Sequence, residues 1–302
     1  MKINIIFLLS FIASGALAQV TYSSVYKDVN YADDGMSYHN MDIYIPQAKK
    51  IDYPVIVVVY GSAWFANNLK DAAIQTMAKH LLDAGFAVVA PNHRSSNEAK
   101  FPAQINDIKA AIRFIRGQAK KYNLDTSFVG ITGYSSGGHL AALAGTSGTV
   151  KNFTVGKVTQ DIEGSLGNYN GYSSKVHAVV DWFGPTNLWV IDSCRGKDAR
   201  QPNTPEEVLI GGKVDDNYDK CALLDPAIYI DKKTPPFLIL HGDRDVVVPA
   251  CQSELLYSAL QKAKVPSQYV LVNGGQHGPG MFTDQYFKMM TDFFRSRLTT
   301  TR

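Results

Sequence analysis

The pattern of hydrophobic and polar positions changes along the chain. Residues 20–45 alternate apolar and polar side chains around the turn-forming run Asp33-Asp34-Gly35, which predicts an antiparallel hairpin. Residues 55–60 form a continuous apolar run rich in valine, as expected of a strand buried on both faces of a parallel sheet. Similar short runs then alternate with stretches of helical period. This order predicts an α/β fold, with a mostly parallel, doubly wound sheet after an N-terminal antiparallel hairpin.

The periodic pattern weakens between residues 186 and 233. This stretch is rich in Asp, Lys, Pro and Gly. We interpret it as an insertion over the carboxyl edge of the sheet, within a single domain that spans 19–302, rather than as a second domain. Elsewhere we expect helices at 71–84, 102–115, 136–144 and 286–298, and strands at 55–60, 86–90, 128–132, 176–182, 237–240 and 268–272.

The first 18 residues have the parts of a signal peptide. Lys2 supplies a positive start, residues 3–17 are apolar, and Ala16-Leu17-Ala18 is a small-x-small cleavage pattern. A membrane anchor is the alternative, but the apolar stretch is shorter than the roughly 20 residues that span a bilayer. We therefore expect cleavage after Ala18 and export to the periplasm or the exterior, with no membrane-spanning segment in the mature chain.

The charge balance argues against some classes of partner. The formal net charge is +3, from 30 Lys and Arg against 27 Asp and Glu, and no basic run or stripe is present. Binding to nucleic acid or to an anionic membrane surface is therefore not expected. The hydrophobic share of 45% is ordinary for a soluble globular enzyme.

The chain contains three cysteines, Cys194, Cys221 and Cys251. Their spacing is not that of a metal site, so we expect no bound metal. An oxidising compartment permits one disulfide and leaves one thiol. Cys194 and Cys221 flank a polar, loop-like segment, which favours a pairing between these two.

The segment Gly133-Tyr134-Ser135-Ser136-Gly137 fits the pattern G-x-S-x-G. It lies directly between an expected strand and an expected helix, where a serine occupies a sharp turn that exposes its hydroxyl above the sheet. Glycines on both sides let the two backbones cross closely. The alternative is a connecting turn without a function. The context favours Ser135 as a nucleophile.

A serine hydroxyl requires a base within hydrogen-bond reach. Among seven histidines, His277 lies in a glycine-framed loop after the last expected strand, and it completes the chain order Ser, Asp or Glu, His that accompanies this kind of turn. We predict His277 as the base, with loop capping as the alternative. The orienting acid should follow the penultimate strand, where Asp243 and Asp245 are both candidates and spacing alone does not choose between them.

With these segments in view, the sequence resembles the esterase branch of the α/β-hydrolases, which includes hormone-sensitive-lipase-like enzymes and bacterial feruloyl and acetyl-xylan esterases. The resemblance covers about residues 35–295 and implies the α/β-hydrolase fold. In that family the catalytic acid precedes a Val-Pro pair by three residues, which selects Asp245 ahead of Val248-Pro249. Besides the serine turn, it rests on the segments 101–107, 182–188 and 241–249.

The oxyanion loop departs from the family pattern. Where the family usually has His-Gly-Gly-Gly-Trp, this chain has Tyr60-Gly61-Ser62-Ala63-Trp64. The chemistry requires backbone N–H groups aimed at the developing oxyanion rather than particular side chains. We therefore expect the amides of Ser62, Ala63 and Ser136 to form the hole. Trp64 could form a wall of the acyl pocket, or it could pack beneath the loop.

Together these residues predict an exported serine ester hydrolase that needs no cofactor. Ser135 would form an acyl-enzyme with His277 as base and Asp245 holding the imidazole. Since free imidazole titrates near pH 6.5, activity should fall below about pH 6–7. By resemblance, the substrate is a small-molecule or oligosaccharide-linked ester, such as an acetyl or feruloyl group on plant polysaccharide. The alternatives are a prolyl-oligopeptidase-like peptidase, for which the chain has no room for the usual extra domain, and a non-catalytic binding protein.

Overall fold

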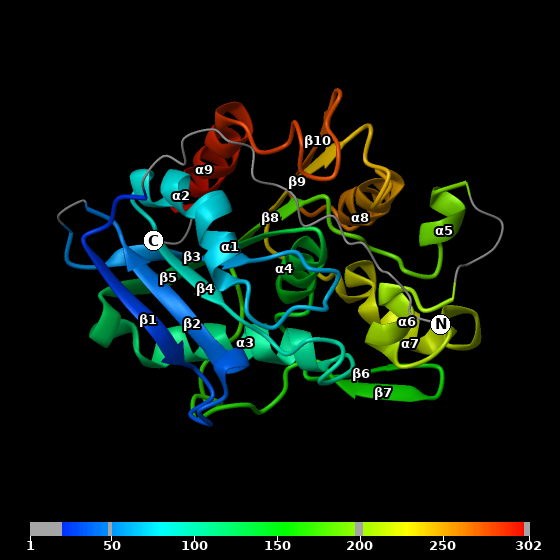
Figure 1. Ribbon diagram of the computed structural model, residues 1–302, viewed down its shortest axis with the longest axis horizontal. Coiled ribbons are helices and arrows are strands. Elements are labelled where there is room, and N and C mark those ends of the chain that lie inside the picture. Colours follow the sequence, from blue (N-terminus) through cyan, green and yellow to red (C-terminus); the bar gives the residue numbers. More distant parts are fainter. Residues whose placement is uncertain (1–19, 48–49, 197–201, 299–302) are drawn as a thin grey trace, which may run out of the picture.

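The computed structural model describes residues 20–47, 50–196 and 202–298. The predicted signal peptide and its cleavage site lie outside the described residues. Within them, strands and helices alternate along the chain, and Figure 1 shows helices packed on both faces of a central sheet.

The sheet begins with the predicted antiparallel hairpin. Strand β1 (Ser24–Asn30) pairs antiparallel with β2 (Asn40–Ile45), and β2 pairs antiparallel with β4 (Ala87–Pro91). The strands from β4 onward are parallel, in the spatial order β1-β2-β4-β3-β5-β8-β9-β10. The predicted fold class is therefore confirmed. The remaining strands of this sheet are β3 (Tyr53–Val59), β5 (Leu124–Tyr134), β8 (Ala178–Trp182), β9 (Phe237–Gly242) and β10 (Ser267–Val272).

Side chains of the parallel strands alternate between two apolar clusters, one on each face of the sheet. In β3, Val57 belongs to one cluster and its neighbour Val58 to the other, and both are fully buried. This explains why the strand reads as a continuous apolar run. The cluster of Val57 is covered by α3 (Ala103–Gly117), α4 (Ser136–Thr146) and α8 (Cys251–Lys262), and that of Val58 by α1 (Lys70–Ala73), the π-helical η2 (Ile74–Ala78), α2 (Lys79–Asp83) and α9 (Asp284–Leu298).

The parallel strands end close together at their carboxyl edge. Val59 lies opposite Gly133, Tyr134 opposite Trp182, and Trp182 opposite Leu240. Loops that follow different strands therefore meet at this edge, which is where open α/β sheets bind their ligands.

The segment 186–233 contains short helices rather than only loops. These are α5 (Ile191–Cys194), α6 (Pro205–Ile210) and α7 (Tyr218–Leu224), with short turns between them. A second small sheet, formed by β6 (Asn152–Val155) and β7 (Val158–Asp161), was not expected from the sequence, and neither was α8.

The disulfide differs from the predicted pairing. Cys194 is bonded to Cys251, with 6.2 Å between their Cα atoms, and Cys221 is not part of a disulfide. Cys221 lies on α7 with its side chain in the apolar core, 1% exposed. The pairing of Cys194 with Cys221 was wrong because the segment around Cys221 is helical and turns this side chain inward, away from Cys194 at the end of α5.

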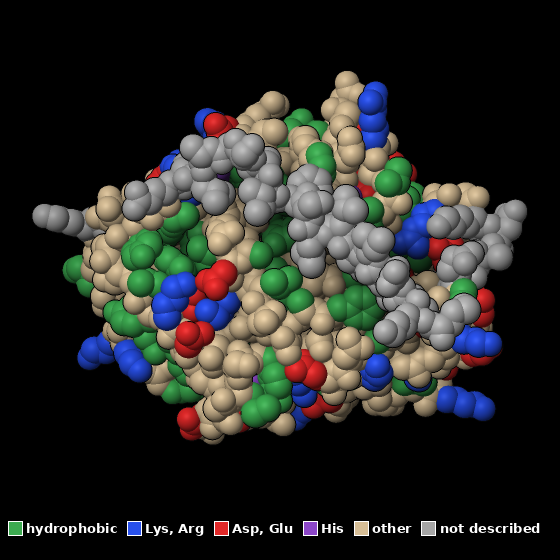
Figure 2. All heavy atoms as spheres, viewed as in Figure 1, with side chains coloured by type: hydrophobic (Ala, Val, Ile, Leu, Met, Phe, Trp, Pro, Cys, Tyr) green, Lys and Arg blue, Asp and Glu red, His purple; other side chains and the backbone are tan. Residues whose placement is uncertain are grey.

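Charged side chains of both signs lie on the face of the molecule that Figure 2 shows. Figure 2 shows Lys and Arg side chains scattered among acidic ones on the face in view, without a continuous basic stripe. Among the described residues, no helix is long and apolar enough to cross a bilayer.

Candidate active site

Ser135 lies at the sharp turn between β5 and α4. Its φ is 56° and its ψ is −127°, a conformation that side chains rarely adopt, and its amide donates to the carbonyl of Trp182 at 2.9 Å. The flanking glycines are required by close packing, because a Cβ on Gly133 would meet the carbonyl of Gly137, and a Cβ on Gly137 would meet the carbonyl of Val59. The sequence G-x-S-x-G thus folds here into a strained turn at the carboxyl edge of the sheet.

His277 reaches this serine from the loop between β10 and α9. Its Nε2 is 2.9 Å from Ser135 Oγ. Gly274 and Gly278 in this loop have φ values of 74° and 108°, which favour glycine. The edge of the Phe183 ring packs on the imidazole, with 4.8 Å between ring centres. The loop and this aromatic contact fix the ring in place.

Asp245 follows β9 and contacts the other nitrogen of the same imidazole. Its Oδ2 is 2.7 Å from His277 Nδ1, and its Oδ1 accepts hydrogen bonds from the amides of Val247 and Val248, both at 2.9 Å. Burial would raise the pKa of Asp245, but the imidazoles of His241 and His277 and the Val248 amide outweigh this and lower it to about 2. The carboxylate therefore only accepts, so Nδ1 carries the proton and Nε2 presents its lone pair to Ser135.

The structure separates the two candidate acids. Asp243 Oδ1 accepts a hydrogen bond from the Gly274 amide at 2.7 Å, so this carboxylate ties the loop after β9 to the loop that carries His277. Asp245, and not Asp243, contacts the imidazole. The structure thus brings Ser135, His277 and Asp245 together in the order that the sequence predicts.

His241 lies buried behind Asp245. Its Nε2 donates to the carbonyl of Val248 at 2.8 Å, its Nδ1 is 2.6 Å from Ser253 Oγ, and the Asp245 carboxylate is 3.6 Å away. His241 therefore holds the loop after β9 by hydrogen bonds rather than contacting Ser135.

The oxyanion loop differs from the prediction at one of its three amides. The amide of Ser62 donates to the side chain of Ser136 at 2.8 Å and is therefore occupied. Gly61 packs against the nucleophile turn, since a Cβ on it would lie 2.8 Å from the Cβ of Ser135. Among the described residues, none accepts a hydrogen bond from the amides of Ala63 or Ser136. These two amides remain as the donors of a candidate hole.

Trp64 packs beneath the loop instead of forming a pocket wall. Its side chain is 3% exposed and meets the buried His139 edge to face, with 5.3 Å between ring centres. Its carbonyl accepts a hydrogen bond from the Ser96 amide at 2.8 Å. The assignment of Trp64 to substrate binding is therefore corrected in favour of the packing alternative.

Two residues near the site were missed by the sequence reasoning. Phe183 follows β8 directly at the carboxyl edge of the sheet, which was the signal available for it. Arg195 follows α5, and its Nε and Nη2 donate to the carbonyl of Val247 at 3.2 and 2.8 Å. Nothing in the local sequence indicated that Arg195 reaches the loop of Asp245, since this contact spans 52 positions.

No group of three or more His, Cys, Asp or Glu side chains in the described part of the chain is arranged to hold a metal ion. The geometry is that of a nucleophile, a base and an orienting carboxylate, with two backbone donors beside them. Such an arrangement can carry out acyl transfer through a covalent serine intermediate.

Comparisons with known proteins agree with this geometry. A family model described as BD-FAE matches residues 41–260. The esterase LipQ of Mycobacterium tuberculosis is 30% identical over 212 residues, which cover 70% of this chain and 46% of LipQ. The chain spans about half the length of the curated relatives that it matches first.

Two solved structures are more similar. A truncated form of a carbohydrate esterase from gut microbiota is 51% identical with a TM-score of 0.91, covering 93% of this chain and 99% of that one. A bifunctional GH43-CE protein of Bacteroides eggerthii is 53% identical with a TM-score of 0.88, covering 90% of this chain and 35% of that one.

Proposed function

Because the chain belongs to the BD-FAE family, in the esterase branch of the α/β-hydrolases, we propose that it is a carboxylic-ester hydrolase that works through an acyl-enzyme on Ser135. The observation that carries this proposal is the contact of His277 with both Ser135 Oγ and Asp245 Oδ2, at 2.9 and 2.7 Å.

In the first step, Ser135 Oγ bonds to the ester carbonyl carbon while its proton passes to Nε2 of His277. Asp245 stabilises the imidazolium that forms. The amides of Ala63 and Ser136 donate to the tetrahedral oxyanion, and each such donor is worth roughly 3–4 kcal/mol. The intermediate then collapses, the carbon–oxygen bond to the alcohol breaks, and the imidazolium gives its proton to the leaving alkoxide.

The second step reverses these roles with water. His277 takes a proton from a water molecule, whose oxygen attacks the acyl carbon. The second tetrahedral intermediate expels Ser135 Oγ, which recovers its proton from the imidazolium, and the carboxylic acid is released. The tautomer with the proton on Nδ1, favoured by the low pKa of Asp245, is the one that both steps require.

We further propose that the protein is exported through its N-terminal signal sequence and removes acetyl or feruloyl groups from plant polysaccharide. Support comes from the signal-like residues 1–18 and from the 51% identity to a carbohydrate esterase over nearly the whole of that chain. The substrate class rests on this similarity.

A substrate panel tests the proposal. The purified protein should hydrolyse p-nitrophenyl acetate, methyl ferulate or acetylated xylan, and Ser135→Ala should reduce the rate by several orders of magnitude. An organophosphonate should label the wild type at Ser135 and leave the variant unlabelled. Cleavage of a peptide amide in preference to every ester would indicate a peptidase, and absence of both labelling and turnover would indicate a binding protein.

A further inference from the structure

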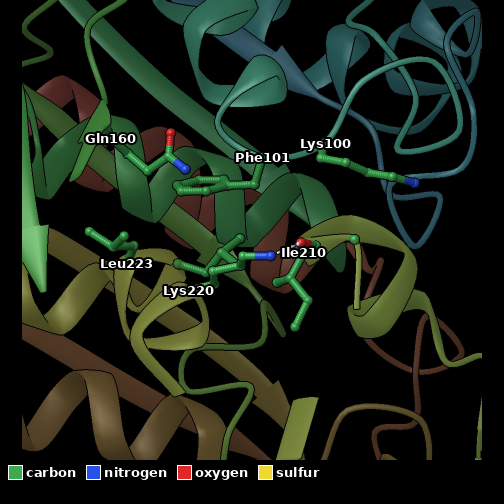
Figure 3. A pocket seen from close by; sticks show the side chains of 8 residues that line it. Lys100, Phe101, Gln160, Ile210, Lys220 and Leu223 are labelled. Atoms are coloured by element: carbon green, nitrogen blue, oxygen red, sulfur yellow. Dashed lines mark hydrogen bonds between the residues drawn. The ribbon is translucent and has the colours of Figure 1, made fainter. Parts of the chain in front are cut away.

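A cavity lies among the loop before α3, the small sheet and the helices of the segment 186–233, apart from the candidate triad. It has a volume of about 250 Å³ and lies between the loop before α3, strand β7 and helices α6 and α7. Its volume is slightly below the roughly 300–1,000 Å³ of typical ligand pockets, so it suits one sugar ring rather than a chain. The lining residues are Lys100, Phe101, Gln160, Ile210, Gly211, Lys220, Leu223 and Leu224 (Figure 3).

The lining combines an apolar wall with cationic and amide groups. The apolar wall consists of the buried residues Phe101, Leu223 and Leu224. The polar lining residues Gln160 and Lys220 are half-buried. Figure 3 shows the Lys220 side chain extending towards Ile210, and among the described residues its ammonium donates only to the carbonyl of Ile210, at 3.3 Å. No described residue hydrogen-bonds the side-chain amide of Gln160, which leaves both groups available to a ligand.

The charge of the cavity is positive and not neutralised. No Asp or Glu lines it, and neither lysine forms an ion pair with another described residue. The Lys100 ammonium donates to the carbonyl of Ser96 at 2.8 Å, so its chain forms part of the rim and Lys220 is the cation that faces the cavity. An ammonium is suited to a carboxylate, to which it donates a charge-assisted hydrogen bond, and the Gln160 amide in the same lining offers a second donor.

The cavity is close to the nucleophile but separate from it. The carbonyl of Leu224, in the cavity wall, accepts a hydrogen bond from Nε2 of His139 at 2.8 Å. His139 lies in the first turn of α4, where its amide donates to the carbonyl of Ser135 at 3.1 Å. Since the buried His139 links the cavity wall to the nucleophile turn, we infer that a group bound in the cavity is a neighbouring part of the substrate rather than the acyl group being cleaved.

We propose that this cavity binds a carboxylate-bearing sugar, a uronic acid unit of the polysaccharide whose ester is cleaved at Ser135. The carboxylate pairs with the ammonium of Lys220, with the amide of Gln160 as a further donor, and the apolar face of the sugar ring packs on Phe101. This inference rests on the proposed ester hydrolysis and adds to it a preference for acidic over neutral polymers.

The test compares hydrolysis of acetylated oligosaccharides that differ only in a uronic acid branch. For Lys220→Gln, kcat/KM on the acidic substrate should fall about tenfold, as expected for loss of a charge-assisted hydrogen bond. On the neutral substrate, kcat/KM should not change. Lys213→Gln is the matched control, because Lys213 is exposed on the same insertion and does not line the cavity. Equal rates of the wild type on both substrates would overturn the proposal.

Direct binding separates this proposal from the proposed activity. Glucuronate titrated into the wild type, followed by protein NMR, should bind saturably, and Lys220→Gln and Gln160→Ala should each weaken it several-fold while Lys213→Gln does not. Hydrolysis of p-nitrophenyl acetate, which carries no sugar, measures the ester-hydrolase activity separately in the wild type and in Lys213→Gln. Glucuronate binding that is absent, insensitive to Lys220, or replaced by binding of ferulate would overturn the sugar assignment even if the ester is hydrolysed.

Discussion

Ser135 has a positive φ, and the close packing of Gly133 and Gly137 holds the turn in this conformation. A side-chain-bearing residue in this conformation costs roughly 1–3 kcal/mol, and the turn is held by the close contacts of Gly133 and Gly137 with surrounding carbonyls. The result is that the hydroxyl oxygen of Ser135 lies 2.9 Å from Nε2 of His277. The backbone strain therefore positions the proposed nucleophile without any movement of the side chain.

Asp245 fixes which nitrogen of His277 carries the proton. Replacing one of its carboxylate oxygens by an amide nitrogen, in Asp245→Asn, tests this role. In Asp245→Asn, the amide nitrogen can donate to Nδ1, which places the imidazole proton on Nε2 and removes the base from Ser135. We expect kcat for an activated ester to fall about 10⁴-fold. Steady-state kinetics, with circular dichroism to verify folding, measure this.

Asp243→Asn is the matched control for that variant. The asparagine oxygen can still accept from the Gly274 amide, so kcat should change by less than about threefold. A large loss in Asp243→Asn together with a small loss in Asp245→Asn would reverse the assignment of the acid.

His39 should make stability depend on pH, far from the catalytic groups. It is 3% exposed and lies between two carboxylates, 2.6 Å from Asp34 Oδ2 and 3.5 Å from Asp107 Oδ1. Burial opposes its protonation, but hydrogen bonds and charge attraction with Asp107 and Asp34 outweigh this and raise its pKa. A raised histidine pKa stabilises the fold fully below the unfolded value of about 6.5, and this contribution is lost as pH rises through the folded value.

Urea unfolding of the wild type and His39→Gln as a function of pH measures this contribution. The wild type should exceed the variant in free energy of unfolding most clearly near pH 6, and the difference should shrink towards pH 9. His80→Gln is the control, since His80 pairs with the fully exposed carboxylate of Asp284. A difference for His39→Gln that stays constant with pH would contradict the role given to its charge.

Chain order was sufficient to predict Ser135 and His277, whereas the choice of Asp245 over Asp243 also required the resemblance to the esterase family. Neither was sufficient for the oxyanion loop. Ser135 and His277 are flanked by glycines whose conformational freedom the turns require. The local sequence therefore indicates the turns that carry these two residues. The engagement of the Ser62 amide depends on a hydroxyl 74 positions away. Trp64 is similar, because its burial is set by His139 on another element.

The segment 186–233 contacts the loop of the candidate acid, Asp245, through Arg195. The carbonyl of Val247, which Arg195 binds, belongs to the same peptide unit as the Val248 amide, which donates to Asp245. Asp192 in turn fixes the guanidinium at 2.7 Å. Both hydrogen bonds polarise the peptide between Val247 and Val248 in the same direction, so each strengthens the other. Together they hold the loop of Asp245 in position beside His277.

Removal of this support should reduce turnover more than substrate binding. For Arg195→Met we expect kcat to fall on the order of tenfold with little change in KM, since a small displacement of the acid misorients the base. Arg195→Lys should recover part of the loss. Arg116→Met is the control, because Arg116 also donates to backbone carbonyls, those of Ser173 and Thr126, at a distance from the site. Equal losses in the two methionine variants would argue against a positioning role.

The disulfide joins α5 to α8, the helix that follows the loop of Asp245. Cys194 ends α5, Cys251 begins α8, and the two are 57 positions apart. Cross-linking a loop of this length should stabilise the fold by about 2–4 kcal/mol. Cys194→Ser/Cys251→Ser should lower the free energy of unfolding by that amount, measured in urea. Reductant should destabilise the wild type similarly and leave the double variant unchanged; an effect of reductant on the variant would show that another process is responsible.

Elements with a strong apolar period were predictable, and those with mixed faces were not. The central parallel strands β3, β4, β8 and β9 are buried throughout and read as continuous apolar runs. Helix α8 was missed because four of its twelve residues are buried and two of these, Gln252 and Ser253, are polar. Gln252 is buried because its side chain accepts hydrogen bonds from the amides of Thr186 and Asn187, a tertiary contact without a local signal.

The whole molecule is organised by a sheet that serves two cores at once. Because neighbouring residues of each central strand enter opposite clusters, neither cluster can lose its packing while the sheet remains intact. The loops that carry Ser135, Asp245 and His277 follow β5, β9 and β10, and their spacing is set by the same sheet. The candidate site and the fold should therefore be lost together.

Calorimetry tests this coupling. Unfolding should be a single transition whose calorimetric and van't Hoff enthalpies agree, with loss of p-nitrophenyl acetate hydrolysis at the same temperature. Val57→Ala and Val58→Ala remove buried methyl groups from opposite cores, so each should cost about 2 kcal/mol and shift that one transition downwards. If the insertion were an independent domain, a second transition would appear that neither substitution moves. Because α5 is tied to α8 by the disulfide and to the acid loop by Arg195, we expect it to unfold with the sheet.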